Sequence, residues 1–244
     1  MQTATESESV VTISNLQFRW QSQSPVVLDL NALTIGKGER VFIEGPSGSG
    51  KSTLLSLFAG VSVPQQGEVR VLGQPLDRLS SVQRDHFRAQ HIGYIFQMFN
   101  LIPYLSMLDN VMLPCRFSRA RHAKALKRSQ SLETEAKRLL EHLDMAQEDL
   151  MHRSVTALSV GQQQRVAAAR ALMGAPELLI ADEPTSSLDA DRREAFVRLL
   201  FHECKQAGST LIFVSHDASL EGLFDRTIRL AGLNTVCTAA ARED

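Results

Sequence analysis

Residues 45–52, with the sequence Gly-Pro-Ser-Gly-Ser-Gly-Lys-Ser, are the chemically most specific segment of the chain. They match the pattern G-x-x-x-x-G-K-[ST], in which the glycines let backbone N–H groups turn toward phosphate oxygens. The apolar runs at 40–44 and 53–59 predict a strand before this loop and a helix after it, and a helix N-terminus favours anions. We therefore expect Lys51 to reach the terminal phosphates of a nucleotide and the Ser52 hydroxyl to bind Mg²⁺.

Two consecutive carboxylates, Asp182 and Glu183, follow a short apolar run that begins at residue 177. A buried parallel strand would carry them to the sheet edge where such sheets bind ligands. Asp182 would then support Mg²⁺, and Glu183 would polarise the water that attacks the γ-phosphate. A solvated acidic turn is the alternative interpretation, which the phosphate-binding loop upstream disfavours.

A histidine, His216, follows another apolar run at 210–215. At the end of a third core strand it could hydrogen-bond the γ-phosphate and hold the attacking water. The alternative is a histidine that is merely solvated in a loop.

Residues 158–165, Leu-Ser-Val-Gly-Gln-Gln-Gln-Arg, open a helix that Ser159 is suited to N-cap. A serine hydroxyl, a glycine N–H and a helix N-terminus together make an anion site, although a well-capped amphipathic helix would have the same sequence. Two phosphate sites in one chain are economical if two copies face each other. Each nucleotide would then lie between the loop of one copy and the capped helix of the other.

Short apolar segments alternate with longer stretches of helical period, which is typical of a mainly parallel sheet with crossover helices. Residues 103–159 have helical period, many charges and no convincing strand, which indicates a helical insert. The clearest predicted strands are 40–44, 91–96, 177–182 and 210–215. Weaker candidates, which we expect to form an antiparallel flank, are 12–20, 69–72 and 225–230.

The composition is that of an ordinary globular protein: 244 residues, 43% hydrophobic and 22% charged, with a formal net charge of −1. This balance excludes disorder as the main state and argues against nucleic-acid binding through bulk positive charge. Three cysteines, Cys115, Cys204 and Cys237, are too few and too far apart for a disulfide framework or a Cys-x-x-Cys site. Residues 1–9 are polar and no apolar run approaches the ~20 residues of a membrane span, so we expect a cytosolic chain.

The order of these motifs resembles the nucleotide-binding subunit of an ATP-binding cassette (ABC) transporter, over about residues 11–232. The resemblance implies an α/β fold: a P-loop NTPase core with a mainly parallel sheet, an antiparallel β flank and a helical subdomain. One ATPase domain would cover 10–232, with a core at 10–97 and 163–232, a helical subdomain at 98–162, and tails at 1–9 and 233–244.

The resemblance also assigns roles to residues. Residues 158–162 become the signature, 186–189 (Ser-Ser-Leu-Asp) the D-loop, and Trp20 the aromatic that stacks on adenine, with Phe18 as its competitor. The implied catalytic residues are Glu183, His216, Lys51 and Gln97, and the implied Mg²⁺ ligands are Ser52, Gln97 and Asp182. The residues expected to bind ATP are Trp20, Gly45, Pro46, Ser47, Gly48, Ser49, Gly50, Lys51, Ser52, Thr53, Ser159, Gly161, Gln162 and Asp189.

Val160 stands where the family usually has glycine, and valine cannot easily adopt a positive φ, so we expect a slower or looser closed state. Gln97 lies between a strand and the insert, where it could report nucleotide state to a partner; a polar strand end is the alternative. A basic run in the insert is interpreted as a solvated helix face, with contact to anionic lipid or to an acidic permease tail as alternatives. Its residues are Arg116, Arg119, Arg121, Lys124, Lys127 and Arg128.

The leading hypothesis is an ATPase that dimerises around two ATP molecules and powers a membrane permease from the cytoplasmic side of the inner membrane, as a peripheral subunit. Residues 73–76, 92–97 and 100–103 resemble the ATPases of lipoprotein-releasing and macrolide-exporting systems, whose permeases carry a large periplasmic domain. The alternative from another class is a regulatory ATPase that signals through a membrane partner without transport. A nucleic-acid-binding cassette protein and a small-molecule kinase are disfavoured, the first by charge and the second by Glu183 and the Ser159 helix.

Overall fold

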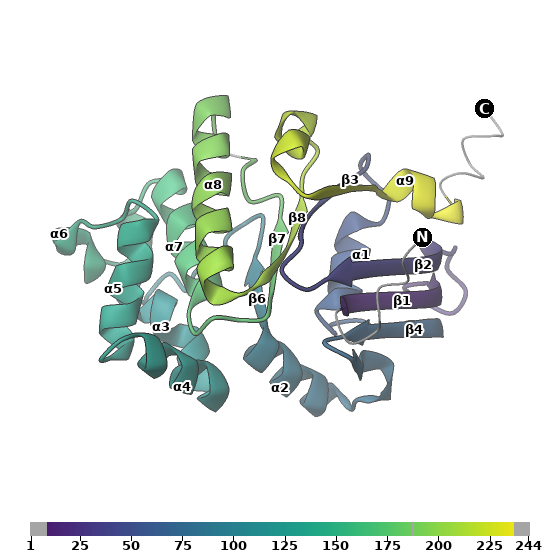
Figure 1. Ribbon diagram of the computed structural model, residues 1–244, viewed down its shortest axis with the longest axis horizontal. Coiled ribbons are helices and arrows are strands. Elements are labelled where there is room, and N and C mark those ends of the chain that lie inside the picture. The colour runs from purple at the N-terminus through teal and green to yellow at the C-terminus, as the bar shows by residue number, and fades with distance from the viewer. Residues whose placement is uncertain (1–8, 187, 237–244) are drawn as a thin grey trace. The chain divides into compact units, whose positions relative to one another are not determined.

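The computed structural model describes residues 9–186 and 188–236, and it divides the chain into two compact units (Figure 1). Unit 1 contains the described residues up to Arg88 and those from Ile212 onward, and unit 2 is Ala89–Leu211. Within the described residues, no helix combines the length and apolar character that crossing a bilayer requires. The division into a core and a helical subdomain at 98–162 stays a proposal.

Unit 1 holds the antiparallel strands and the first helices. Its strands are β1 (Ser9–Phe18), β2 (Leu28–Gly36), β3 (Arg40–Glu44), β4 (Gln66–Val71), β5 (Gln74–Pro75) and β9 (Arg226–Arg229). Its helices are α1 (Lys51–Phe58), α2 (Ser81–His91), which ends in unit 2, α9 (Leu230–Leu233), and the 3-10 helices η2 (Leu76–Arg78) and η4 (Ala218–Leu223).

An antiparallel sheet of strand order β2-β1-β4-β5 confirms the predicted flank. In β1 the buried positions change parity, from Val11 and Ile13 to Leu16 and Phe18. The β1–β4 register shifts between Ser14 and Gln17, which is expected of a β-bulge that changes which face of the strand is buried. The sequence analysis did not predict β2, because the alternation of apolar and polar residues along this strand also changes parity partway. Helix α1 packs against this sheet beside β4 (Figure 1).

The other sheet has the strand order β6-β7-β8-β3-β9. Strands β6 (Ile92–Ile95) and β7 (Leu178–Asp182) pair in parallel within unit 2. Strand β8 (Thr210–Val214) begins in unit 2 and continues in unit 1, where the N–H of Ser215 donates to Ile43. The four clear strand predictions are confirmed to within one residue at each end.

Strand β9 is a correction. Residues 225–230 were expected in the antiparallel flank, but β9 pairs with β3 in parallel, with Val41 opposite Arg226. The strand has four residues, and among them only Ile228 is buried, so its sequence has no pattern of a core strand. Its position follows instead from Arg40, whose backbone and guanidinium both bond to the Asp225 carboxylate.

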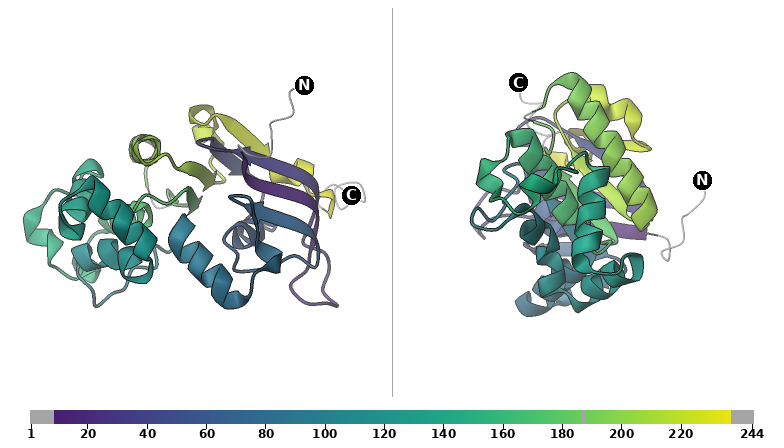
Figure 2. Two further views of the ribbon diagram at one scale, coloured as in Figure 1. Left: turned by 60° about the horizontal axis from the view of Figure 1, so that its bottom comes forward. Right: turned by 90° about the vertical axis from the view of Figure 1, so that its left-hand side faces the viewer.

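Unit 2 is mainly helical. Its helices are α3 (Met107–Phe117), α4 (Arg119–Arg128), α5 (Leu132–His142), α6 (Glu148–Met151), η3 (Val155–Ala157), α7 (Val160–Leu172) and α8 (Ala190–Ala207). Figure 2 shows α3, α4 and α5 gathered into one helical cluster, and α3 and α5 both pack on α7. Residues 103–159 hold no strand beyond the isolated bridge between Ser106 and Ser154, so the predicted helical texture is confirmed.

Serine N-caps explain how several short helices follow one another here. The hydroxyls of Ser106, Ser118, Ser131 and Ser159 each accept a hydrogen bond from a backbone N–H in the first turn of α3, α4, α5 and α7. Each cap satisfies a donor that the helix leaves unpaired and stabilises the helix start by ~1 kcal/mol. The caps therefore fix where each helix begins.

The basic run at 116–128 is not a uniform solvated face, which corrects that interpretation. Arg121 is buried and donates to the carbonyl oxygens of Met173 (2.7 Å) and Ala171 (2.5 Å) at the end of α7, and burial lowers its pKa to about 10. Lys124 pairs with Glu177 at 2.5 Å. Arg116 and Arg128 pair with acidic side chains as well, so four of the six charges have partners within the chain.

Candidate nucleotide site

The phosphate-binding loop joins β3 to α1, so the predicted strand, loop and helix are confirmed. Gly48 and Gly50 have φ of 82° and 96°, a region that side-chain-bearing residues rarely adopt. A Cβ on Gly50 would also lie 2.6 Å from a methyl of Leu28. Glycine is therefore required at both positions for the backbone N–H groups to line the loop.

Lys51 lies at the start of α1 with its ammonium over the loop. Its Nζ donates to the carbonyl oxygens of Gly45 (2.6 Å) and Pro46 (3.0 Å). An ammonium has three donors, so these two bonds hold the side chain in place and leave one N–H for a phosphate oxygen. Pro46, Ser47, Gly48 and Ser52 are exposed, whereas Ser49 and Thr53 are buried beneath the loop.

Asn234 is a residue of this region that the sequence analysis missed, since it fell in the expected C-terminal tail. Its side chain is fully buried and donates to the carbonyl oxygens of Ser49 (3.3 Å) and Val27 (2.9 Å). It also accepts the N–H of Asp29 at 3.0 Å. The buried side-chain amide of Asn234 thus connects the loop to β2. An asparagine just after an apolar turn does not reveal this role in the sequence.

His216 follows β8 and is exposed at a pocket of about 330 Å³. The pocket lies in unit 1 and also includes Gly45 and Pro46, so His216 and the first residues of the loop line one cavity. Arg229, another lining residue, is paired with Glu44 at 3.4 Å and Glu221 at 2.7 Å. These carboxylates offset the charge of Arg229 beside the pocket.

In unit 2, the carboxyl ends of β6 and β7 bring the predicted acidic residues beside Gln97. The Nε2 of Gln97 lies 3.5 Å from Oε2 of Glu183. Tyr94 of β6 hydrogen-bonds the Asp182 carboxylate, and burial, together with that negative charge, raises the pKa of Tyr94 well above its usual range. Tyr94 is a second residue that the sequence analysis missed, because in the sequence it reads as one more apolar position of a strand.

Glu183 has a left-handed backbone, with φ of 46°. A residue with a side chain occupies this region at a cost of about 1 kcal/mol or more, and such positions cluster at functional sites. The strained turn directs the chain away from β7 immediately after Asp182. Both carboxylates are only partly exposed.

Trp20 and Phe18 differ sharply in exposure. Trp20 is 59% exposed just beyond β1, and Phe18 is 3% exposed in the core. Their rings meet edge to face, with centroids 5.1 Å apart. Only Trp20 therefore presents a ring face to a ligand without unpacking the core.

The segment at 158–162 forms the capped start of α7. Ser159 Oγ accepts from the N–H of Gln162 at 3.3 Å, and Gln162 Oε1 accepts from the N–H of Ser159 at 2.8 Å, so the predicted N-cap is confirmed as a capping box. Val160 has helical backbone at the first helical position, not the positive φ that would have strained it. A Cβ on Gly161 would meet Leu188 at an ordinary 3.7 Å.

The expected D-loop is described in part. Ser187 lies outside the described residues, and Asp189 caps α8 by accepting the N–H of Arg192 at 3.0 Å. The expected Mg²⁺ ligands Ser52, Gln97 and Asp182 offer a hydroxyl, an amide and a carboxylate oxygen. This all-oxygen donor set fits Mg²⁺.

Comparison with known proteins gives consistent matches. A family model described as "ABC transporter" matches residues 28–186, more than half of the chain. An ABC transporter ATP-binding protein of Escherichia coli (strain K12), YbbA, is 42% identical over 200 residues, which are 81% of this chain and 83% of the relative. The lipoprotein-releasing system ATP-binding protein LolD of Syntrophotalea carbinolica is 38% identical over 199 residues, covering 82% and 84%.

Among solved structures, the chain resembles the ATP-binding cassette MJ0796 as a dimer in a post-hydrolysis state bound to ADP and Pi. The TM-score is 0.78 at 34% identity, and the match covers 90% of this chain and 93% of that one. The similarity therefore extends over both compact units rather than over the phosphate-binding loop alone.

Proposed function

Because the chain belongs to the ABC transporter family, whose ATP-binding subunits hydrolyse ATP, dimerise and work with a membrane permease, we propose that two copies close on two ATP molecules and power an exporter. The exporter would be a lipoprotein, macrolide or peptide efflux system. The dimer would lie on the cytoplasmic side of the inner membrane as a peripheral subunit, and its permease would carry a large periplasmic domain.

The chain's own residues divide the chemistry between them. Lys51 and the loop N–H groups hold the terminal phosphates, and Trp20 stacks on the adenine. Glu183 accepts a proton from the attacking water, and His216 holds the γ-phosphate and that water. Ser52, Gln97 and Asp182 would hold Mg²⁺, which would supply charge neutralisation at the phosphates. Ser159 and Gly161 of the second copy complete the anion site.

The proposed coupling of ATP hydrolysis to the permease rests on two sets of contacts that β6 and the residues just after it make. Tyr94 contacts Asp182 and Gln97 reaches Glu183, so this segment touches both carboxylates of the hydrolytic site. Tyr94 and Phe96 also line a second pocket of about 220 Å³ in unit 2, together with Phe117 of α3. One short segment therefore connects the carboxylates to an apolar pocket.

This second pocket is where we expect the permease to dock. Phe96 and Phe117, which both line this pocket, are exposed large side chains. Exposed apolar groups of this kind, at the rim of a pocket, mark protein interaction sites. A permease segment seated here would contact Phe96, the neighbour of Gln97, so a shift of Gln97 when ATP is lost would move that contact.

A regulatory ATPase, signalling through a membrane partner without transport, uses the same motifs and remains the second candidate. What favours transport is the relative LolD, which is named for a lipoprotein-releasing system. The partner chain is what distinguishes the two functions.

Photo-crosslinking identifies that partner. A photoreactive amino acid at Phe117, in cells that express the full chain, should give an ATP-dependent adduct with an integral membrane protein. The same amino acid at Val61, an exposed apolar position in unit 1, serves as the matched control and should give none. An adduct with a permease supports transport, an adduct with a membrane-bound sensor or cell-wall enzyme supports regulation, and no membrane adduct contradicts both.

A further inference from the structure

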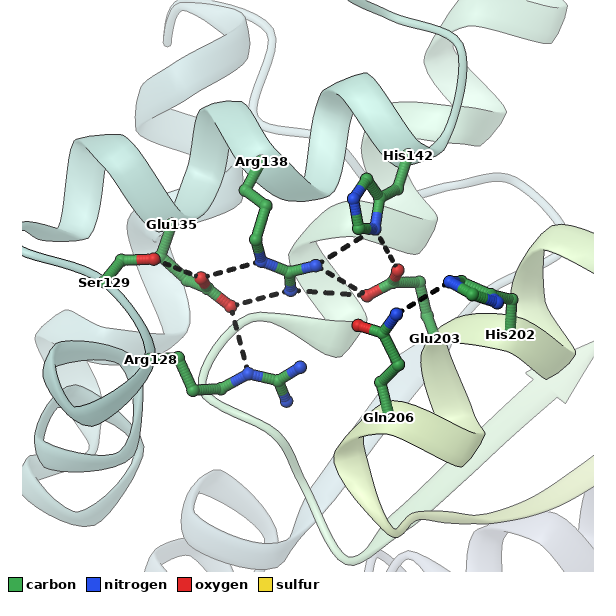
Figure 3. Close-up of polar contacts among 8 residues, drawn as sticks. All are labelled: Arg128, Ser129, Glu135, Arg138, His142, His202, Glu203 and Gln206. Carbon is green, nitrogen blue, oxygen red and sulfur yellow. Dashed lines mark hydrogen bonds and ion pairs between the residues drawn. The ribbon is translucent and has the colours of Figure 1, made fainter.

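Two histidines and a glutamate, none of which we assign to the nucleotide site, meet between α5 and α8 (Figure 3). His142 is the last residue of α5, and His202 and Glu203 are neighbours on α8. One possible ligand atom of each lies within 4.8 Å of the other two. All three residues belong to unit 2.

The contacts of His142 place incompatible demands on one atom. Its Nδ1 lies 3.0 Å from Nη1 of Arg138 and 2.5 Å from Oε1 of Glu203. A guanidinium can only donate and an ionised carboxylate can only accept, so Nδ1 cannot hydrogen-bond both in one protonation state. If it accepts from Arg138, its lone pair faces the lone pairs of Glu203. A proton between Nδ1 and Oε1 removes this repulsion at the present separation, and a metal ion bound to both atoms removes it once they move apart to make bonds of ~2.0 Å.

His202 is the feature that favours a metal ion over a proton. A shared proton needs two atoms, whereas a transition metal ion takes three or four ligands. The ring centroids of His142 and His202 are 5.9 Å apart, and Gln206 Nε2 lies 2.7 Å from His202 Nε2. Figure 3 shows His142 above the Glu203 carboxylate and His202 beside it, next to the Gln206 amide.

The surroundings hold the carboxylate in place. The Glu203 side chain is 2% exposed, and its Oε2 accepts from Arg138 at 3.3 Å, which leaves Oε1 toward the imidazoles. Arg138 is itself fixed by two bonds of 2.9 Å to Glu135. Outer partners of this kind orient metal ligands and are a general part of metal sites.

We propose that His142, His202 and Glu203 bind a divalent transition-metal ion of the Zn²⁺ class. Two imidazoles and one carboxylate suit Zn²⁺, whereas Mg²⁺ and Ca²⁺ prefer oxygen alone. His142 is 37% exposed at its side chain and His202 is exposed, so both rings can rotate to bring their nitrogens to ~2.0 Å from the ion. Water completes the coordination, and the ion ties the end of α5 to α8.

The test is a Zn²⁺ titration of the nucleotide-free full chain against a chromophoric chelator. The wild type should bind one more Zn²⁺ per chain than His142→Ala or His202→Ala, or bind it at least about tenfold more tightly. His152→Ala, at an exposed histidine outside the cluster, is the matched control and should behave as the wild type. Zn²⁺ should raise the Tm of the wild type and the control, and not that of the two variants.

Equal Zn²⁺ binding by the wild type and His202→Ala would overturn the proposal, because His142 and Glu203 would then share only a proton. So would a loss of binding in His142→Ala alone. Should an alanine variant unfold without metal, His202→Gln keeps the polar volume and carries the same expectation.

Discussion

Nε2 of Gln97 and Oε2 of Glu183 lie 3.5 Å apart, although the residues follow two different strands. The parallel pairing of β6 with β7 causes this, since Tyr94 lies opposite Ile180 and Ile95 opposite Ala181. The two side chains leave the sheet at one edge and can touch. A movement of the Glu183 carboxylate when ATP is hydrolysed can therefore displace Gln97, which begins the segment that leads into the helices of unit 2.

Replacing Glu183 tests its role as the base. Glu183→Gln should lower the ATPase kcat by about a hundredfold or more, because an amide cannot accept the proton of the attacking water. ATP binding should persist, and size-exclusion chromatography with ATP should show an accumulated dimer. Glu141→Gln, at an exposed glutamate of α5, is the control. Turnover within a few-fold of the wild type would contradict the assignment.

Gln97 should affect turnover more than ATP binding. Gln97→Ala removes the contact with Glu183, so we expect kcat to fall by about tenfold. The KM for ATP should change less than kcat, since Trp20, the phosphate-binding loop and the other two expected Mg²⁺ ligands are untouched. Met98→Ala, at the exposed neighbouring residue, should leave both constants unchanged. A rise in KM with kcat intact would show that Gln97 serves binding instead.

Trp20 should act through its ring face. Trp20→Ala should weaken ATP binding by about tenfold, since stacking of a base on an aromatic ring contributes roughly 1–3 kcal/mol. Trp20→Tyr keeps a ring and should bind nearly as the wild type. Fluorescence of a labelled ATP analogue measures both affinities. An equal loss in the two variants would rule out stacking.

Glu177, with its partners His91 and Lys124, should make a pH-dependent contribution to stability. Burial would raise the pKa of Glu177, but hydrogen bonds from His91 and Lys124, with the Lys124 charge, outweigh it and lower the pKa from 4.5 to about 2. The folded state thus favours the carboxylate, and the stabilisation is present above pH 4.5 and lost as the pH falls from 4.5 to 2. The Glu177 side chain is 37% exposed, so solvent screens the pair.

Glu177→Gln should accordingly reduce the free energy of unfolding by ~1 kcal/mol at pH 7. Urea titrations of the variant and the wild type at pH 7, 5 and 4 measure the difference, which should shrink below pH 4.5. Glu141→Gln should show no such trend. A difference that grows on acidification would contradict the lowered pKa.

The sequence predicted the parts of the fold in which local pattern and tertiary position agree. The loop at 45–52 needs glycine at positions 48 and 50, and the pattern records that need directly. The four clear strands are continuous apolar runs because both of their faces are buried. The predicted N-cap at Ser159 is likewise local, since its partner Gln162 lies only three positions further along the chain.

Other features depended on contacts between distant segments. Arg121 reads as surface in a basic run, yet it is buried because carbonyl groups at the end of α7 accept its hydrogen bonds. Asn234 and Tyr94 gain their places from partners 207 and 88 positions away in the chain, Val27 and Asp182. The predicted antiparallel orientation of β9 was wrong. Only one of its four residues is buried, and this pattern does not indicate which strand β9 pairs with or in which direction.

Mixed dimers test the central claim, that each ATP lies between Lys51 of one copy and Ser159 of the other. Differently tagged chains allow heterodimers to be purified in two arrangements, both with Lys51→Ala and Ser159→Phe. With one mutation on each chain, one site keeps both native residues, and ATPase activity should return to about half of the wild type. With both mutations on one chain, each site has one defect, and activity should be absent. The reverse result, activity only when both mutations share a chain, would contradict the account.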